Sequence, residues 1–164
     1  MTDGQPEMTI AFEACDEADV EAVARRLAPL LAADDVLLLE GPLGAGKTVF
    51  ARALIRARCK EPAREVESPS FALMLVHEPA GGPVLNHVDL YRIEDPRELD
   101  ELGLEDMMAG AITLIEWPGH GPGFTAFDPL LVTLGPRPDG RRDLRLRGGR
   151  RWQDRLRRLG GTPA

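Results

Sequence analysis

Apolar residues along the first half of the chain change period several times. Residues 16–31 repeat them at helical spacing after an acidic first turn, which predicts a helix. Residues 36–39, VLLL, form a continuous apolar run, typical of a strand buried on both faces. Residues 47 to about 59 return to helical spacing. With a short strand expected at residues 9–12, this half predicts alternating strands and helices.

The second half contains several short apolar stretches bounded by Gly, Pro or Asp, which predict strands. Between the predicted strands at 83–93 and 111–118, a helix start is expected, because Asp95, Pro96 and Glu98 have the spacing of a capping box. Early strand–helix units imply parallel strands, and the late run of strands with short turns implies antiparallel additions. The predicted strands lie within SPSFALMLVHE (68–78), PVLNHVDLYRI (83–93), AITLIEWP (111–118), PLLVTLGP (129–136) and RDLRLRG (142–148).

The length of 164 residues fits a single domain, residues 1–164, whose core we expect at about 9–147. Cys15 and Cys59 are far apart and have no metal-binding spacing, which favours free thiols in a reducing compartment. The N-terminus has no leader pattern, and no apolar stretch is long enough to cross a bilayer. We therefore expect a cytoplasmic protein that contacts no membrane.

The formal charge of −7 is distributed unevenly along the chain. Residues 141–164 contain nine arginines and two aspartates and carry +7, so the rest is strongly acidic. This tail, which includes the arginine-rich segment 148–164, could contact RNA or an acidic partner. Alternatively, RRDLRLRGG alternates like an edge strand protected by arginines, and WQDRLRRL is typical of an amphipathic helix that packs Trp152, Leu156 and Leu159. We favour the structural interpretation.

Residues 41–48, GPLGAGKT, match the phosphate-binding pattern G-x-x-x-x-G-K-[ST] at every fixed position. The motif follows a predicted strand and opens a predicted helix, as its function requires. Glycines let main-chain N–H groups face a polyphosphate, the lysine neutralises phosphate oxygens, and the threonine hydroxyl is a ligand for Mg²⁺. We expect cofactor contacts from Pro42, Leu43, Gly44, Ala45, Gly46, Lys47 and Thr48.

This motif predicts a P-loop NTPase-like α/β fold: three layers with a mixed, mostly parallel central sheet and antiparallel C-terminal strands. The guanine-reading motif N-K-x-D is missing from the sequence. ATP is therefore favoured over GTP as the nucleotide.

Two carboxylates end predicted strands and are candidates for catalysis. A P-loop ATPase needs a second oxygen ligand for Mg²⁺ and a group that orients the attacking water. Glu116 ends ITLIE and Asp89 ends LNHVD, which places both at the sheet edge where open α/β sheets bind ligands. Ser70 of the S-P-S segment is either a plain turn residue or a switch hydroxyl near the γ-phosphate.

The remaining candidates carry weaker signals. Trp117 either packs in the core or forms a wall of the nucleotide pocket. His77, His87 and His120 have no metal-ligand spacing, so we interpret them as packing or surface residues.

The motifs GPLGAGKT, SPSF, HVDLYRI with DPRELDELGLED, and IEWP occur in this order. In this combination, the chain resembles the bacterial TsaE (YjeE) family over roughly residues 9–135. That family comprises small ATPases of the pathway that makes threonylcarbamoyladenosine at position 37 of tRNA. The resemblance implies a P-loop fold with a mixed sheet, ATP and Mg²⁺ as cofactors, and weak hydrolysis stimulated by the partner proteins TsaD and TsaB.

The resemblance also implies roles for individual residues. Two positions depart from the family pattern: Ser70 stands where Thr is frequent and keeps the hydroxyl, and Val49 replaces a second Ser or Thr after the motif. Matched by position, Gly44 to Thr48 hold the phosphates, Thr48 and Glu116 are the Mg²⁺ ligands, and Asp89, Ser70 and Trp117 are tied to activity. The catalytic candidates are therefore Lys47, Asp89 and Glu116. The chain beyond residue 140 matches no family motif; Arg141 or Arg142 is a candidate to reach the adenine side.

The leading hypothesis is an ATPase that docks to TsaD and TsaB in a nucleotide-dependent manner. It would meet tRNA indirectly, or through the C-terminal arginines, and would not contact DNA. One alternative is a small-molecule kinase, which would need an acceptor pocket and a cationic lid; the long loop at 119–129 has no Lys or Arg. The other is a nucleotide-sensing binding module without meaningful hydrolysis.

Overall fold

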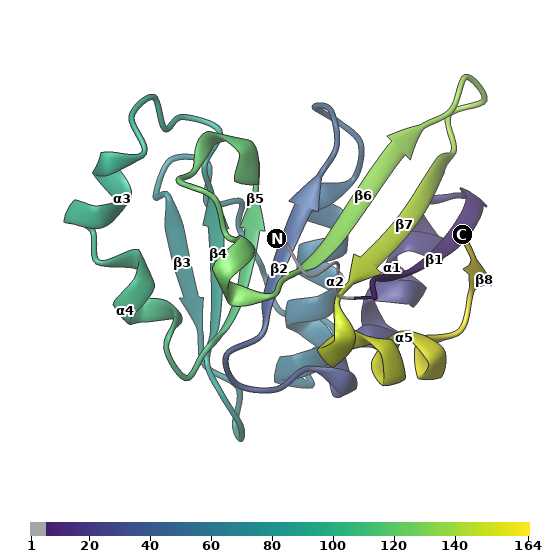
Figure 1. Ribbon diagram of the computed structural model, residues 1–164, viewed down its shortest axis with the longest axis horizontal. Coiled ribbons are helices and arrows are strands. Elements are labelled where there is room, and N and C mark those ends of the chain that lie inside the picture. The colour runs from purple at the N-terminus through teal and green to yellow at the C-terminus, as the bar shows by residue number, and fades with distance from the viewer. Residues whose placement is uncertain (1–5) are drawn as a thin grey trace.

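The computed structural model describes residues 6–164 and is built around one eight-stranded mixed sheet (Figure 1). The strand order is β3-β4-β5-β2-β6-β7-β1-β8. The strands are β1 (Met8–Cys15), β2 (Val36–Glu40), β3 (Met74–His77), β4 (Leu85–Asp89), β5 (Ile112–Glu116), β6 (Leu130–Pro136), β7 (Arg142–Gly148) and β8 (Thr162–Pro163). The α-helices are α1 (Glu17–Leu27), α2 (Lys47–Cys59), α3 (Arg97–Glu101), α4 (Leu104–Met108) and α5 (Gln153–Leu159).

The centre of the sheet is parallel and its flanks are antiparallel. β4, β5, β2 and β6 run parallel to one another. β3 at one end, and β7, β1 and β8 at the other, join in antiparallel register. The predicted fold class is therefore confirmed. The carboxyl ends of β2, β4 and β5 consequently meet at one edge of the sheet.

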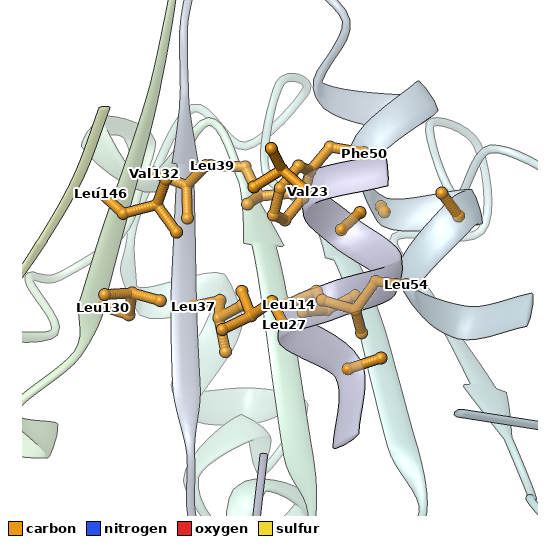
Figure 2. Close-up of a cluster of buried hydrophobic side chains, with 14 of the residues drawn as sticks. Val23, Leu27, Leu37, Leu39, Phe50, Leu54, Leu114, Leu130, Val132 and Leu146 are labelled. Atoms are coloured by element: carbon orange, nitrogen blue, oxygen red, sulfur yellow. The ribbon is translucent and has the colours of Figure 1, made fainter. Parts of the chain in front are cut away.

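Helices cover the two faces of the sheet unequally. α1 and α2 pack behind it in the view of Figure 1, whereas the short α3 and α4 lie at its left end. In the main core, side chains of the central strands meet those of α1 and α2 (Figure 2). Leu37 and Leu39 of β2 belong to this core, while Val36 belongs to a second cluster on the other face. The VLLL run is thus buried on both sides, as predicted.

The arginine-rich C-terminus is part of the fold. Trp152, Leu156 and Leu159 are 0–1% exposed and join the main core, so the predicted amphipathic helix is confirmed. The prediction that residues 141–149 form an edge strand was wrong, because β7 lies between β6 and β1. β1, from the opposite end of the chain, pairs along β7 from Met8↔Gly148 onward. Local alternation does not indicate a pairing over so many residues.

Two loop regions depart from the predicted elements in detail. β3 occupies only the end of the stretch 68–78, because residues before it form turns in which the Leu73 N–H donates to the Pro69 carbonyl. After Asp95, a positive φ of 65° at Gly103 separates α3 from α4. Within residues 6–164, no helix combines the length and apolar character needed to cross a bilayer.

Candidate functional site

The glycine-rich turn between β2 and α2 forms a concave main-chain surface at the carboxyl edge of the sheet. Gly44 and Gly46 have φ values of 79° and 107°, in the region that side chains disfavour. A Cβ at Gly41 would lie 2.6 Å from the main-chain oxygen of Leu134. The first N–H groups of α2 have no acceptor within the helix, and the helix dipole adds positive potential there. The turn therefore fits an anion such as a polyphosphate.

Lys47, the first residue of α2, lies inside this turn. Its Nζ donates hydrogen bonds to the carbonyl oxygens of Gly41 and Pro42, at 2.6 and 3.0 Å. The ammonium also lies 4.1 Å from the centre of the Trp117 ring. Burial lowers the pKa of Lys47, and the negative charges of Glu116 and Asp89 partly oppose this effect. A phosphate oxygen would add a direct anionic partner to this desolvated cation.

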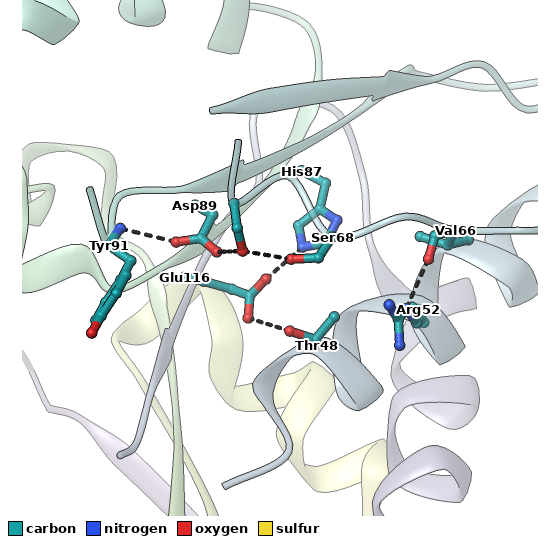
Figure 3. A network of polar contacts seen from close by, with 9 residues as sticks. Thr48, Arg52, Val66, Ser68, His87, Asp89, Tyr91 and Glu116 are labelled. Atoms are coloured by element: carbon teal, nitrogen blue, oxygen red, sulfur yellow. Dashed lines mark hydrogen bonds and ion pairs between the residues drawn. The ribbon is translucent and has the colours of Figure 1, made fainter. Parts of the chain in front are cut away.

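Thr48 and Glu116 meet next to the turn, although 68 residues separate them in the chain. The Thr48 hydroxyl donates to Oε1 of Glu116 at 2.9 Å. The other carboxylate oxygen lies 2.8 Å from Nε2 of His87, which comes from the adjacent strand β4 (Figure 3). Glu116 is 2% exposed and His87 is fully buried. Both oxygens of Glu116 are thus held by uncharged donors or an imidazole, rather than by Lys or Arg.

Asp89 forms a second polar centre directly beside Glu116. The two residues are register partners at the ends of β4 and β5. Asp89 accepts hydrogen bonds from the Ser70 hydroxyl at 3.0 Å and from the Tyr91 N–H at 2.9 Å. Ser68 extends this network through a 2.8 Å hydroxyl–hydroxyl contact with Ser70 (Figure 3). The turn before β3 is thereby tied to a carboxylate of the site.

These groups line a hollow of about 240 Å³. A larger hollow of about 400 Å³ is lined by acidic and basic side chains, among them Glu21 and Arg52, and shares only Val49 with the site hollow. Most residues predicted for the site line the smaller hollow. Its lining consists of Leu43, Gly44, Gly46, Lys47, Thr48, Val49, Ser70, Asp89, Tyr91, Glu116 and Trp117.

Three predicted site residues lie outside that lining. Pro42 and Ala45 belong to the turn itself, where the Ala45 N–H donates to the Pro42 carbonyl and Ala45 is buried. Arg141 is exposed in the β6–β7 turn, where its N–H donates to Asp139. Its neighbour Arg142 lies closer: a Cβ at Gly46 would be 3.9 Å from the Arg142 side chain.

Sequence reasoning missed two residues next to the hollow. His87 had been interpreted as packing or surface, yet it contacts Glu116. A signal was present, because His87 lies two positions before Asp89 in one strand and so shares its face. Tyr91 packs its ring 4.9 Å from Trp117, whose φ of 57° is unusual for a non-glycine residue. No local pattern indicated that contact.

The oxygen donors of the site fit Mg²⁺ better than a softer metal. Among residues 6–164, no group of three or more His, Cys, Asp or Glu side chains is arranged to hold a metal ion. Mg²⁺ does not require such a cage, since one or two protein oxygens, waters and substrate phosphates complete its shell. Thr48 Oγ1 and Glu116 Oε1 supply hard oxygen atoms in residues that line the same hollow as Lys47.

A family model described as "Threonylcarbamoyl adenosine biosynthesis protein TsaE" matches residues 14–143. The chain belongs to the TsaE family. The matched range contains the glycine-rich turn, both carboxylates and the Ser70 turn. The resemblance found in the sequence motifs is therefore confirmed.

Named relatives agree with this membership. A Rickettsia conorii protein named "tRNA threonylcarbamoyladenosine biosynthesis protein TsaE" is 41% identical over 101 residues, which are 62% of this chain and 57% of the relative. A Mycobacterium leprae protein of the same name is 42% identical over 107 residues, covering 60% of this chain and 65% of the relative. The similarity spans less than two thirds of the length of these two relatives.

A solved structure shares the fold of this TsaE-family chain. YdiB of Bacillus subtilis superposes with a TM-score of 0.69, covering 94% of this chain and 95% of YdiB at 24% sequence identity. At that identity, the likeness shows the architecture alone. It confirms the mixed sheet with its helices as a known arrangement.

Proposed function

We propose that this TsaE-family protein is the ATP-binding and hydrolysing subunit required for threonylcarbamoyladenosine modification of tRNA at position 37. It would act by docking to the TsaD–TsaB assembly in a nucleotide-dependent manner. The observation that carries the proposal is the 2.9 Å contact between Thr48 Oγ1 and Glu116 Oε1 beside the Lys47 turn. This contact joins the phosphate-binding loop to a carboxylate from a neighbouring strand, as P-loop chemistry requires.

Nucleotide binding would rest on the turn and on Lys47. Main-chain N–H groups of Gly44 to Thr48 would donate to phosphate oxygens, and the Lys47 ammonium would exchange its two carbonyl acceptors for phosphate. The Trp117 ring shields one side of that ammonium from water. These features favour a ligand with several negative charges over a neutral one.

Thr48 and Glu116 would hold Mg²⁺, which when bound neutralises charge on the β- and γ-phosphates. Asp89 lies beside Glu116 in register and would orient the attacking water by accepting its proton in a hydrogen bond. Ser70 would respond to the γ-phosphate, because its hydroxyl connects the turn before β3 to Asp89. If the phosphate replaced Asp89 as the partner of this hydroxyl, the turn would move.

The rim of the hollow supports docking to a protein partner. Three large apolar or aromatic side chains near the site are exposed: Leu43 by 79%, Phe71 by 87% and Tyr91 by 48%. Leu43 lies in the glycine-rich turn, Phe71 follows Ser70, and Tyr91 is two positions after Asp89. Aromatic and aliphatic side chains exposed together are typical of interaction surfaces. Because Leu43 is in the phosphate loop and Phe71 follows Ser70, their positions would depend on the nucleotide.

The proposal is tested first by nucleotide binding and single-turnover hydrolysis. Lys47→Ala should weaken Mg-ATP binding, because it removes the cation from the turn. Asp89→Ala should retain ATP affinity and lose turnover, because Asp89 is proposed to orient the attacking water and not to bind the nucleotide. Lys60→Asn is the matched control: it changes the chain's other lysine, which is exposed at the end of α2. Wild-type turnover of Asp89→Ala would remove that residue from the mechanism.

Docking is tested by a pull-down of TsaD and TsaB with ATP, with ADP and without nucleotide. Retention should depend on the nucleotide, and ATP turnover should rise when both partners are added. Tight ATP binding without stimulation would contradict the partner role. Transfer of labelled phosphate to a small acceptor would instead support the kinase alternative, and partner binding with no single-turnover hydrolysis would support the sensing module.

A further inference from the structure

His87 occupies a buried position directly behind Glu116. The imidazole Nε2 lies 2.8 Å from Glu116 Oε2, and the two side chains are 0% and 2% exposed. His87 is the middle residue of β4 and pairs in register with Leu75 of β3 and Leu114 of β5. The neighbouring strands thus fix the backbone of His87, and burial of the ring together with its contact to Glu116 restricts the side chain.

The contact restricts the orientation of the Glu116 carboxylate. A glutamate side chain has three rotatable bonds, so burial alone does not determine where its oxygens point. Here Oε2 is bound to His87 and Oε1 accepts the Thr48 hydroxyl at 2.9 Å (Figure 3). With Oε2 anchored, Oε1 remains directed at the glycine-rich turn.

The hydrogen-bond partners of His87 also indicate the direction of this contact. Among the residues that the structure describes, the buried Nδ1 has no hydrogen-bond partner. A carboxylate only accepts, so the shared hydrogen belongs to Nε2, which donates it to Glu116 Oε2. The hydrogen bond of the imidazole is therefore directed at this carboxylate.

We infer that His87 is a positioning residue: its Nε2–H holds Glu116 so that the oxygen next to Thr48 faces the cation that accompanies the nucleotide. The inference rests on the proposed function, because it assigns the cation site to Thr48 and Glu116. It adds a residue that contacts neither nucleotide nor cation. Outer groups that orient a metal ligand in this way typically change metal affinity when they are removed.

The decisive experiment separates cation binding from nucleotide binding. Binding of a non-hydrolysable ATP analogue is measured by calorimetry in EDTA and across a Mg²⁺ titration. His87→Leu should lower the apparent Mg²⁺ affinity by roughly 10- to 100-fold. Affinity in EDTA should stay within about twofold of wild type. His87→Gln, whose amide N–H can replace the Nε2–H, should recover most of the Mg²⁺ dependence.

His77 provides the matched control. It lies on β3 with its ring centre 6.5 Å from that of His87, is also buried, and makes no hydrogen bond or ion pair with Glu116 in the described part of the chain. His77→Leu removes a similar volume of imidazole and should leave the Mg²⁺ titration unchanged. Circular dichroism and thermal unfolding verify that each variant is folded.

A double variant tests whether the two residues act as one unit. In a Glu116→Ala background, His87→Leu should have no further effect on the Mg²⁺ titration. A wild-type Mg²⁺ titration for folded His87→Leu, or equal losses for His77→Leu, would overturn the inference while leaving the proposed function intact. Mg²⁺-independent binding by the wild-type protein would instead overturn the proposed function, and this inference with it.

Discussion

Two buried carboxylates lie at opposite ends of the parallel strands and have different partners. Asp35 precedes β2, is fully buried, and pairs with Arg151 and Arg155 at 2.6 and 2.5 Å. Glu116 ends β5, is 2% exposed, and contacts only Thr48 and His87 among the side chains of residues 6–164. The charge of the first is matched within the fold. The charge of the second is left for a ligand.

Under the proposed function, this difference separates a structural carboxylate from a functional one. Burying an anion is costly unless a cation is held against it, and the two arginines beside Trp152 meet this requirement at Asp35. At Glu116 neither hydrogen-bond partner is a Lys or Arg, so under the proposed function a divalent cation would supply the compensating charge. The comparison also shows that two of the C-terminal arginines hold the fold together, while Arg145 and Arg147 of β7 remain exposed.

The largest expected effect comes from removing both cations at Asp35. Arg151→Met with Arg155→Met leaves a buried, uncompensated carboxylate and should lower the free energy of unfolding by about 3–5 kcal/mol. Urea denaturation measures the loss. Arg157→Met with Arg158→Met is the matched control on the exposed face of α5 and should change stability by under about 0.5 kcal/mol. Equal losses from the two pairs would contradict the structural role of Asp35.

Glu116→Gln should decrease ATP hydrolysis without decreasing the stability of the fold. Single-turnover ATP hydrolysis should fall by roughly 10²- to 10³-fold, because the site loses the charge that attracts Mg²⁺. The free energy of unfolding without nucleotide should stay equal or rise, since the substitution removes a buried charge that is hydrogen-bonded to no Lys or Arg. Glu40→Gln, at the exposed end of the adjacent β2, is the control. A large loss of stability would show that Glu116 is structural.

Asp35→Asn should decrease stability and spare nucleotide binding. The charged hydrogen bonds to two arginines become weaker, and Arg151 and Arg155 can partly rehydrate because their side chains are 34% and 24% exposed. The expected loss in the free energy of unfolding is about 1.5–3 kcal/mol. Mg-ATP affinity, measured by calorimetry, should match wild type. A folded Asp35→Asn protein with impaired ATP binding would contradict the division between a structural carboxylate at Asp35 and a nucleotide site at Glu116.

The smallest effect concerns the pH dependence contributed by His77. Burial lowers the pKa of His77, and the neighbouring His87 and Arg64 lower it further. The unfolded chain therefore takes up this proton first, so the stability contribution is present above pH 6.5 and is lost as the pH falls below it. His77→Leu should reduce the difference in unfolding free energy between pH values above and below 6.5. An unchanged difference would exclude His77 as its source.

Local patterns predicted the parts of the site that depend on nearby residues. The glycine spacing predicted the turn seen at residues 41–46. Gly41 cannot carry a side chain there, because its Cβ would collide with the main chain of Leu134. Strand ends predicted the location of Asp89 and Glu116, because parallel strands present their carboxyl ends at one edge. The His87 contact escaped prediction, since it depends on β4 being the neighbour of β5.

By itself, the sequence determined the alternation of strands and helices, the glycine-rich turn and the family of this protein. These features follow from backbone conformation and from apolar spacing within a few turns of chain. Only the tertiary structure decided that β1 pairs with β7, that Arg155 donates to Asp35 across 120 residues of chain, and that Thr48 donates to Glu116. Such contacts depend on which strands become neighbours, and that choice is made by packing both faces of the sheet at once.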